Sequence, residues 1–123
     1  MRTRIARNIL CIGTDPVNLN LRCAFLKKQG WETVSCGSGH EGIFRFAKGD
    51  IGLVILDLGG EGVEAALIAS EFKRQGPSLP IIMLVSDKDA LVPGATTQAD
   101  AVVLKSEEEV VLPDCVRRLL QPA

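Results

Sequence analysis

The sequence has no excess of charge of one sign and no long apolar run. Its 14 basic residues stand against 15 acidic ones, which gives a formal net charge of −1. A near-neutral chain lacks the positive field that would attract nucleic acid or anionic lipid. The apolar run after the basic start, residues 9–12, is far too short for a signal peptide or a membrane span. We therefore expect no nucleic-acid partner, no membrane partner and a cytoplasmic location.

The sequence also lacks the closely spaced cysteines and histidines of a metal or redox site. No two of the four cysteines form a C-x-x-C pair, and the single histidine, His40, has no group of cysteines or carboxylates close to it. His40 is therefore expected on the surface of a helix. Each cysteine stands among apolar neighbours, which is typical of a small buried hydrophobic residue. We interpret four residues as core cysteines: Cys11, Cys23, Cys36 and Cys115.

What the sequence does contain is the composition of one globular domain. The chain has 123 residues, of which 46% are hydrophobic and 24% are charged. This length suits a single domain with a core of its own, and the balance of apolar to charged residues is not that of a disordered chain. We expect one domain over residues 1–123, with its core between about residues 8 and 120.

Three continuous apolar runs predict the inner strands of a parallel sheet. Residues 9–12, 53–56 and 81–85 are apolar throughout, as strands covered by helices on both faces are. Weaker strands are predicted at residues 31–36 and 101–104. Apolar residues with helical spacing separate the strands. This alternation predicts an α/β fold, a doubly wound five-stranded parallel sheet in the flavodoxin-like order 2-1-3-4-5.

Two segments fit the alternation poorly. Pro93 and Gly94 weaken any helix between the fourth and fifth strands, so that helix is expected to be short or irregular. Pro113 lies in the last predicted helix, where proline is tolerated best in the first turn. The last helix is therefore expected either to begin late or to bend.

Asp57 follows the third strand directly and places a carboxylate at the edge of the sheet where such folds bind ligands. A carboxylate that closes an apolar strand needs a cation or hydrogen-bond donors. A role as a helix cap is the alternative, but Leu58, Gly59 and Gly60 separate Asp57 from any following helix. We favour a functional role for Asp57.

From about Asn8 to Leu120 the sequence resembles the receiver domain of bacterial two-component response regulators. Six landmarks lie in the family's order and in register without gaps, which is a specific signal where one landmark would be weak. The landmarks are residues 9–12 with Asp15-Pro16, residues 30–34, residues 54–57, residues 79–84, Ala99-Asp100 and Leu104-Lys105.

The resemblance implies that Asp57 is the phosphoacceptor. Its partners would be a sensor histidine kinase or phosphotransfer protein and a downstream protein target. Mg²⁺, bound in part by Asp57, and Lys105, which matches the family's lysine, would neutralise the charge of the incoming phosphoryl group. The protein would be a signalling module and not an enzyme, apart from self-phosphorylation and dephosphorylation of Asp57.

The metal-binding positions depart from the family's pattern. Gly13 and Thr14 occupy the positions of the two acidic residues that hold Mg²⁺ in the family. Asp15 is one residue further on and is either a metal ligand or the cap of the first helix, which we favour. We therefore expect weak Mg²⁺ binding, and weak or lost Mg²⁺-dependent phosphorylation of Asp57.

The switch positions depart as well. Val85 stands in place of the family's hydroxyl residue after the fourth strand, and Ser86 could take that role only if a bulge turned it to the same face. Val102 and Ser106 replace an aromatic residue and a proline of the family.

Three interpretations follow from these matches and departures. The first is a receiver that is phosphorylated on Asp57, and the second is a pseudo-receiver, a protein-interaction module regulated without phosphate. The third is a small flavin or nucleotide binder on the same fold. The third ranks lowest because no glycine-rich phosphate loop follows the first strand.

Overall fold

Five parallel strands form the sheet that the sequence predicts, and their order is β2-β1-β3-β4-β5. In this computed structural model, residues 8–86 and 90–120 are described. The second strand begins two residues later than predicted, and the other four agree closely with the apolar runs. The strands are β1 Asn8–Gly13, β2 Thr33–Cys36, β3 Ile51–Asp57, β4 Ile81–Val85 and β5 Ala101–Leu104.

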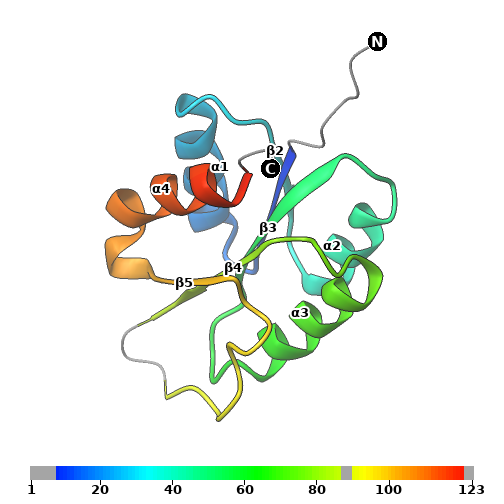
Figure 1. The fold of residues 1–123 in the computed structure, drawn as a ribbon. Coiled ribbons are helices and arrows are strands. Elements are labelled where there is room, and N and C mark those ends of the chain that lie inside the picture. The colour runs from blue at the N-terminus through cyan, green and yellow to red at the C-terminus, as the bar shows by residue number, and fades with distance from the viewer. Residues whose placement is uncertain (1–7, 87–89, 121–123) are drawn as a thin grey trace.

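Helices cover both faces of the sheet in a three-layer arrangement (Figure 1). The helices α1 and α4 lie on one face, and α2 and α3 lie on the other. His40 lies exposed on α2, as expected. The helical segments are α1 Pro16–Lys28, α2 Gly39–Phe46, α3 Val63–Gln75, the short 3-10 turn η1 Lys105–Glu107, and α4 Glu108–Leu120.

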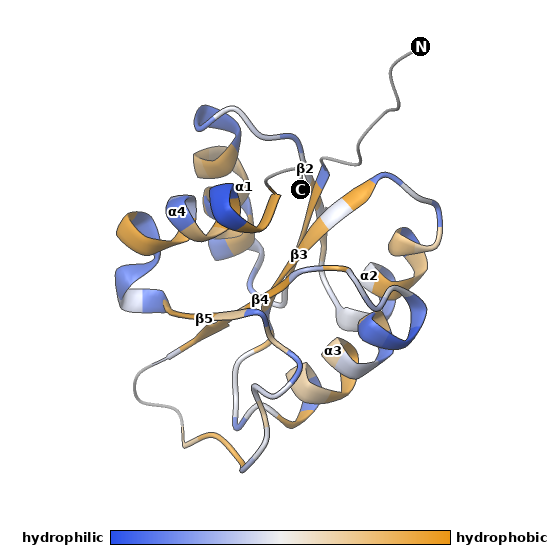
Figure 2. Ribbon diagram, in the orientation of Figure 1, coloured by the Kyte–Doolittle hydropathy of each residue, from blue (hydrophilic) through white to orange (hydrophobic). Residues whose placement is uncertain are grey.

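A buried apolar layer lies on each side of the sheet. Leu53 and Ile55 pack in the layer of α1 and α4, whereas Val54 and Leu56 pack in the layer of α2 and α3. Figure 2 shows the central strands as hydrophobic along most of their length. Alternate residues of a strand point to opposite faces. Asp57 is two residues after Ile55 and therefore points, like Leu53 and Ile55, toward α1 and α4.

The connection between β4 and β5 differs from the prediction of a short or irregular helix. The described part of this connection, residues 90–100, contains turns and no helix. The Val92 amide donates to the Glu61 carbonyl at 2.8 Å, and Ala95 is only 3% exposed. Pro93 and Gly94 disfavour a helix here, so the segment packs as a loop against the turn after β3.

Gly62 lies in that turn and has a positive φ of 88°. A Cβ atom at this position would lie 2.7 Å from the Ala95 Cβ. Both the backbone angle and the close approach therefore require glycine.

The last helix does not begin at Pro113, so the expectation that a late start would place this proline in the first turn is wrong. The α-helix starts at Glu108 after the 3-10 turn, and Pro113 lies inside it. Pro113 is buried together with its neighbour Leu112. No helix within residues 8–86 and 90–120 is long and apolar enough to cross a membrane.

All four cysteines are free and buried, which confirms that they are core residues. None has more than 9% of its surface exposed. We expect the folded protein to show almost no reaction with a thiol reagent such as DTNB, and all four thiols to react once urea unfolds it. Rapid labelling of one thiol without denaturant would contradict this burial.

Candidate functional site

Asp57 is the last residue of β3, and its carboxylate is buried at the carboxyl edge of the sheet. It is 6% exposed. In the register of the sheet it lies beside Gly13, the last residue of β1. A buried carboxylate is costly unless charged or polar partners surround it, so its contacts decide what the site can do.

Lys105 is the first of two cationic partners of Asp57. It follows β5 directly as the first residue of η1, and its Nζ lies 3.0 Å from the Asp57 Oδ1. The Lys105 side chain is 34% exposed, so this partner is in contact with solvent. The structure thus brings Asp57 and Lys105, two of the residues matched to the family, together at this edge of the sheet.

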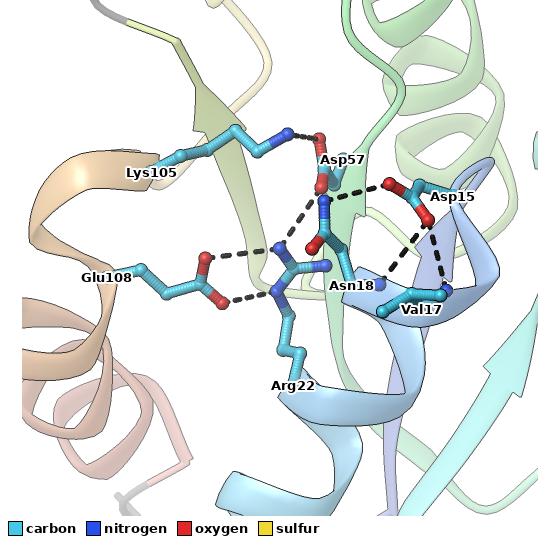
Figure 3. A network of polar contacts seen from close by, with 7 residues as sticks. All are labelled: Asp15, Val17, Asn18, Arg22, Asp57, Lys105 and Glu108. Atoms are coloured by element: carbon cyan, nitrogen blue, oxygen red, sulfur yellow. Dashed lines mark hydrogen bonds and ion pairs between the residues drawn. The ribbon is translucent and has the colours of Figure 1, made fainter.

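Arg22 of α1 is the second partner, and it holds the other oxygen. Its Nη2 donates to the Asp57 Oδ2 at 3.1 Å, and the side chain is only 3% exposed. The same guanidinium binds Glu108, the first residue of α4, through Nε to Oε2 and through Nη2 to Oε1 (Figure 3). Such a two-bond contact fixes the orientation of the guanidinium plane.

The four side chains Arg22, Asp57, Lys105 and Glu108 form what we call the Asp57 cluster. It contains two cations and two carboxylates, so its charges balance. Burial by itself would lower the pKa of Arg22, but the hydrogen bond and charge of Glu108 and then the charge of Asp57 raise it above its usual value. Arg22 therefore stays protonated and acts as a permanent counter-ion of Asp57.

The cluster does not fit the Mg²⁺ site that the resemblance implies. Both Asp57 oxygens already contact cationic nitrogens, and these two positive charges would repel a divalent ion placed beside them. Within residues 8–86 and 90–120 there is no group of three histidine, cysteine or acidic residues arranged to hold a metal. Since Mg²⁺ requires a near-octahedral set of oxygen ligands, these residues offer it a poor site.

Asp15 caps α1, the role that the sequence favoured for it. Its Oδ1 accepts from the Val17 amide at 3.0 Å and from the Asn18 amide at 3.5 Å. Its Oδ2 accepts from the Asn18 side-chain amide at 3.0 Å. The carboxylate thereby satisfies amides at the start of the helix that have no partner within it. The alternative of metal ligation by Asp15 finds no geometric support.

Ser86 follows β4 directly at the same edge of the sheet and is half-buried, as is Val85. No bulge is seen in the pairing of β4 with β5, where Val85 lies in register with Leu104. A role for Ser86 in contacting a phosphoryl group stays a prediction.

The sequence analysis missed Arg22 and Glu108, although the helix pattern contains a signal for both. Arg22 lies three residues after Leu19 and four before Leu26, on the buried face of α1. Glu108 lies four residues before Leu112 on the buried face of α4. A charged residue at an inward helix position requires a partner of opposite charge. Arg22 has two such partners, Asp57 and Glu108, and Glu108 has Arg22.

A groove of about 600 Å³ opens beside the cluster, between α1 and the η1–α4 segment. Its lining includes Arg22, Lys105 and Glu108 together with the apolar side chains of Leu21 and Val110. Leu21 and Val110 are 65% and 80% exposed. Asp57 does not line the groove, because its cationic partners lie between it and this surface.

Comparison with known proteins gives a structural match and no sequence match. No protein-family model matches the chain, and no curated protein matches it in sequence. In solved structures, the chain is similar to response regulator TrrA from Thermotoga maritima in complex with Mg²⁺-BeF, with 27% identity and a TM-score of 0.81 over 93% of this chain and 99% of that one.

Two further structures agree with this match. TrrA bound to the histidine kinase ThkA gives 27% identity and a TM-score of 0.82, over 94% of this chain and 99% of that one. A receiver domain protein from Clostridium thermocellum gives 20% identity and a TM-score of 0.80, over 93% of this chain and 94% of that one. The resemblance to response regulator receiver domains is confirmed, and the chain has their fold.

Proposed function

We propose that this chain is a pseudo-receiver, a two-component signalling module that acts through protein contacts without Mg²⁺-dependent phosphorylation of Asp57. The receiver fold supports a signalling role, and the Asp57 cluster supports the loss of the metal. In this proposal Arg22 supplies the positive charge that Mg²⁺ supplies in phosphorylated receivers. Asp57 then serves as a buried anion at the position of the phosphoacceptor.

The observation that carries the proposal is the pairing of both Asp57 oxygens. Lys105 lies 3.0 Å from one oxygen and Arg22 lies 3.1 Å from the other. To attack a phosphoryl donor, a carboxylate oxygen must face the phosphorus atom while cations neutralise the transferred group. Here both oxygens are in ion pairs, and the guanidinium of Arg22 is fixed in place by its two bonds to Glu108.

The proposed partners are proteins. TrrA forms a complex with a histidine kinase, which supports a sensor histidine kinase or a phosphotransfer protein as one partner of this chain. A downstream protein target and a cytoplasmic location belong to the same proposal. The balanced net charge of −1 gives no reason to add nucleic acid.

Intact-mass spectrometry after incubation with acetyl phosphate and Mg²⁺ tests the proposal. We expect the mass to stay unchanged, because the charges around Asp57 leave neither a metal site nor a free carboxylate oxygen. The Asp57→Asn variant is the matched control. A stoichiometric gain of one phosphoryl group that disappears in this variant would show a phosphorylatable receiver and overturn the pseudo-receiver.

A further inference from the structure

The Asp57 cluster closes a ring around one short segment of the chain. One oxygen of Asp57 binds Lys105, the first residue of η1. The other binds Arg22, which in turn binds Glu108, the first residue of α4. Lys105 and Glu108 are only three residues apart, so both arms of the carboxylate hold the same turn (Figure 3).

The segment inside this ring has few other attachments. It is a 3-10 turn of three residues, a geometry with weaker hydrogen bonds than an α-helix. No side chain caps its start. Ser106 and Glu107 within it are exposed. The Glu108 amide donates to the Lys105 carbonyl, and this bond closes the turn from inside the ring.

We propose that Asp57 is the clasp of this ring, so that its two ion pairs, with Lys105 and with Arg22, hold the η1 turn closed. The inference rests on the proposed function in treating Asp57 as a structural anion. When Asp57 is replaced by asparagine, the negative charge and one acceptor oxygen are removed, so Lys105 and Arg22 both lose their ion pair with this residue and Arg22 keeps its ion pair with Glu108. The η1 turn then opens, and the groove between α1 and α4 changes shape because residues 105–110 line it.

Arg22 determines which part of the ring is released when Asp57 no longer carries a charge. It contacts both carboxylates, and Asp57 and Glu108 repel each other across it. Neutral Asp57 leaves Arg22 wholly to Glu108, so α4 stays attached to α1 while the turn before it is released. The response is therefore confined to the η1 turn, and α4 stays packed on the sheet.

Amide hydrogen exchange followed by NMR tests the clasp in the intact chain. The variant is Asp57→Asn, whose amide NH₂ cannot accept a bond from a cation. We expect the Glu108 amide to exchange roughly tenfold faster than in the wild type, with the buried Val116 amide of α4 within about twofold of its original rate. The matched control is Glu109→Gln, which removes a carboxylate from the same turn but outside the ring and is expected to change neither rate.

The variant Lys105→Met removes only the ion pair between Lys105 and Asp57. It provides the test if Asp57→Asn fails to fold. It is expected to accelerate Glu108 exchange while leaving the Arg22 Nε–H resonance in place. Unchanged exchange at Glu108 in both variants overturns the clasp. The exchange experiment uses no phosphoryl donor, so its result does not depend on the intact-mass experiment. A phosphoryl adduct on Asp57 in that experiment would overturn the proposed function and leave the exchange result unchanged.

Discussion

Replacing Arg22 by methionine lowers the free energy of unfolding by about 3–5 kcal/mol, the cost of removing one partner from a buried ion pair. Methionine keeps most of the apolar contacts of the side chain but leaves Asp57 and Glu108 facing each other without the charge between them. Asp57 is 6% exposed and the Glu108 side chain 18%, so water compensates for little of this loss. Urea denaturation followed by the fluorescence of Trp31, the one tryptophan of the chain, measures it.

Arg74→Met is the matched control. Arg74 pairs with Glu71 on the surface of α3, and its side chain is 70% exposed, so its replacement is expected to change the free energy of unfolding very little. Adding Glu108→Gln to Arg22→Met removes the carboxylate left unpaired and recovers more than half of the loss, because Asp57 still has Lys105. Equal effects of Arg22→Met and Arg74→Met would show that the cluster does not stabilise the fold.

Restoring two carboxylates beside Asp57 creates a divalent metal site where the wild type has a poor one. The variant carries Gly13→Asp and Thr14→Asp, together with Arg22→Met and Glu108→Gln to remove the competing cation and its partner. The backbone accepts a side chain at Gly13, because an added Cβ would meet its nearest neighbour, a Leu19 methyl carbon, at 3.6 Å. Gly13 lies in register with Asp57, so the new carboxylate points to the same face of the sheet.

The control for this variant carries Gly13→Asn and Thr14→Asn in the same background, which keeps the size of the side chains and removes their charge. Titration with Mn²⁺, measured by water-proton relaxation, is expected to show about hundredfold tighter binding to the aspartate variant, or about 2.7 kcal/mol. The same affinity in both variants would mean that the geometry of this edge, and not its charge, prevents metal binding.

The fold could be predicted from the sequence because each inner strand is a continuous apolar run. Runs such as 53–56 are buried on both faces, and only a parallel sheet between two helix layers satisfies that requirement. The predictions that proved wrong concern segments where proline or glycine competes with the hydrophobic pattern. Pro93 and Gly94 turned the expected fourth helix into a loop over the residues described there.

The candidate site was predictable only in part. Asp57 ends β3 and Lys105 follows β5 directly, so the topology alone brings them to one edge of the sheet. Arg22 and Glu108 are on helices whose angle to the sheet no sequence pattern specifies, and ordinary helix reasoning assigns charged residues to the solvent face. Their inward position between apolar neighbours was the signal. It becomes interpretable once α1 and α4 are known to share a face with Asp57.

The alternation of β3 also divides the protein into two halves that can be altered separately. Leu53, Ile55 and Asp57 face α1 and α4, whereas Val54 and Leu56 face α2 and α3. The sheet therefore works as a partition, with the charged cluster on one side and a purely apolar layer on the other. A designer could rebuild the outer surfaces of α2 and α3 to carry a new binding specificity while the Asp57 cluster and its groove stay intact.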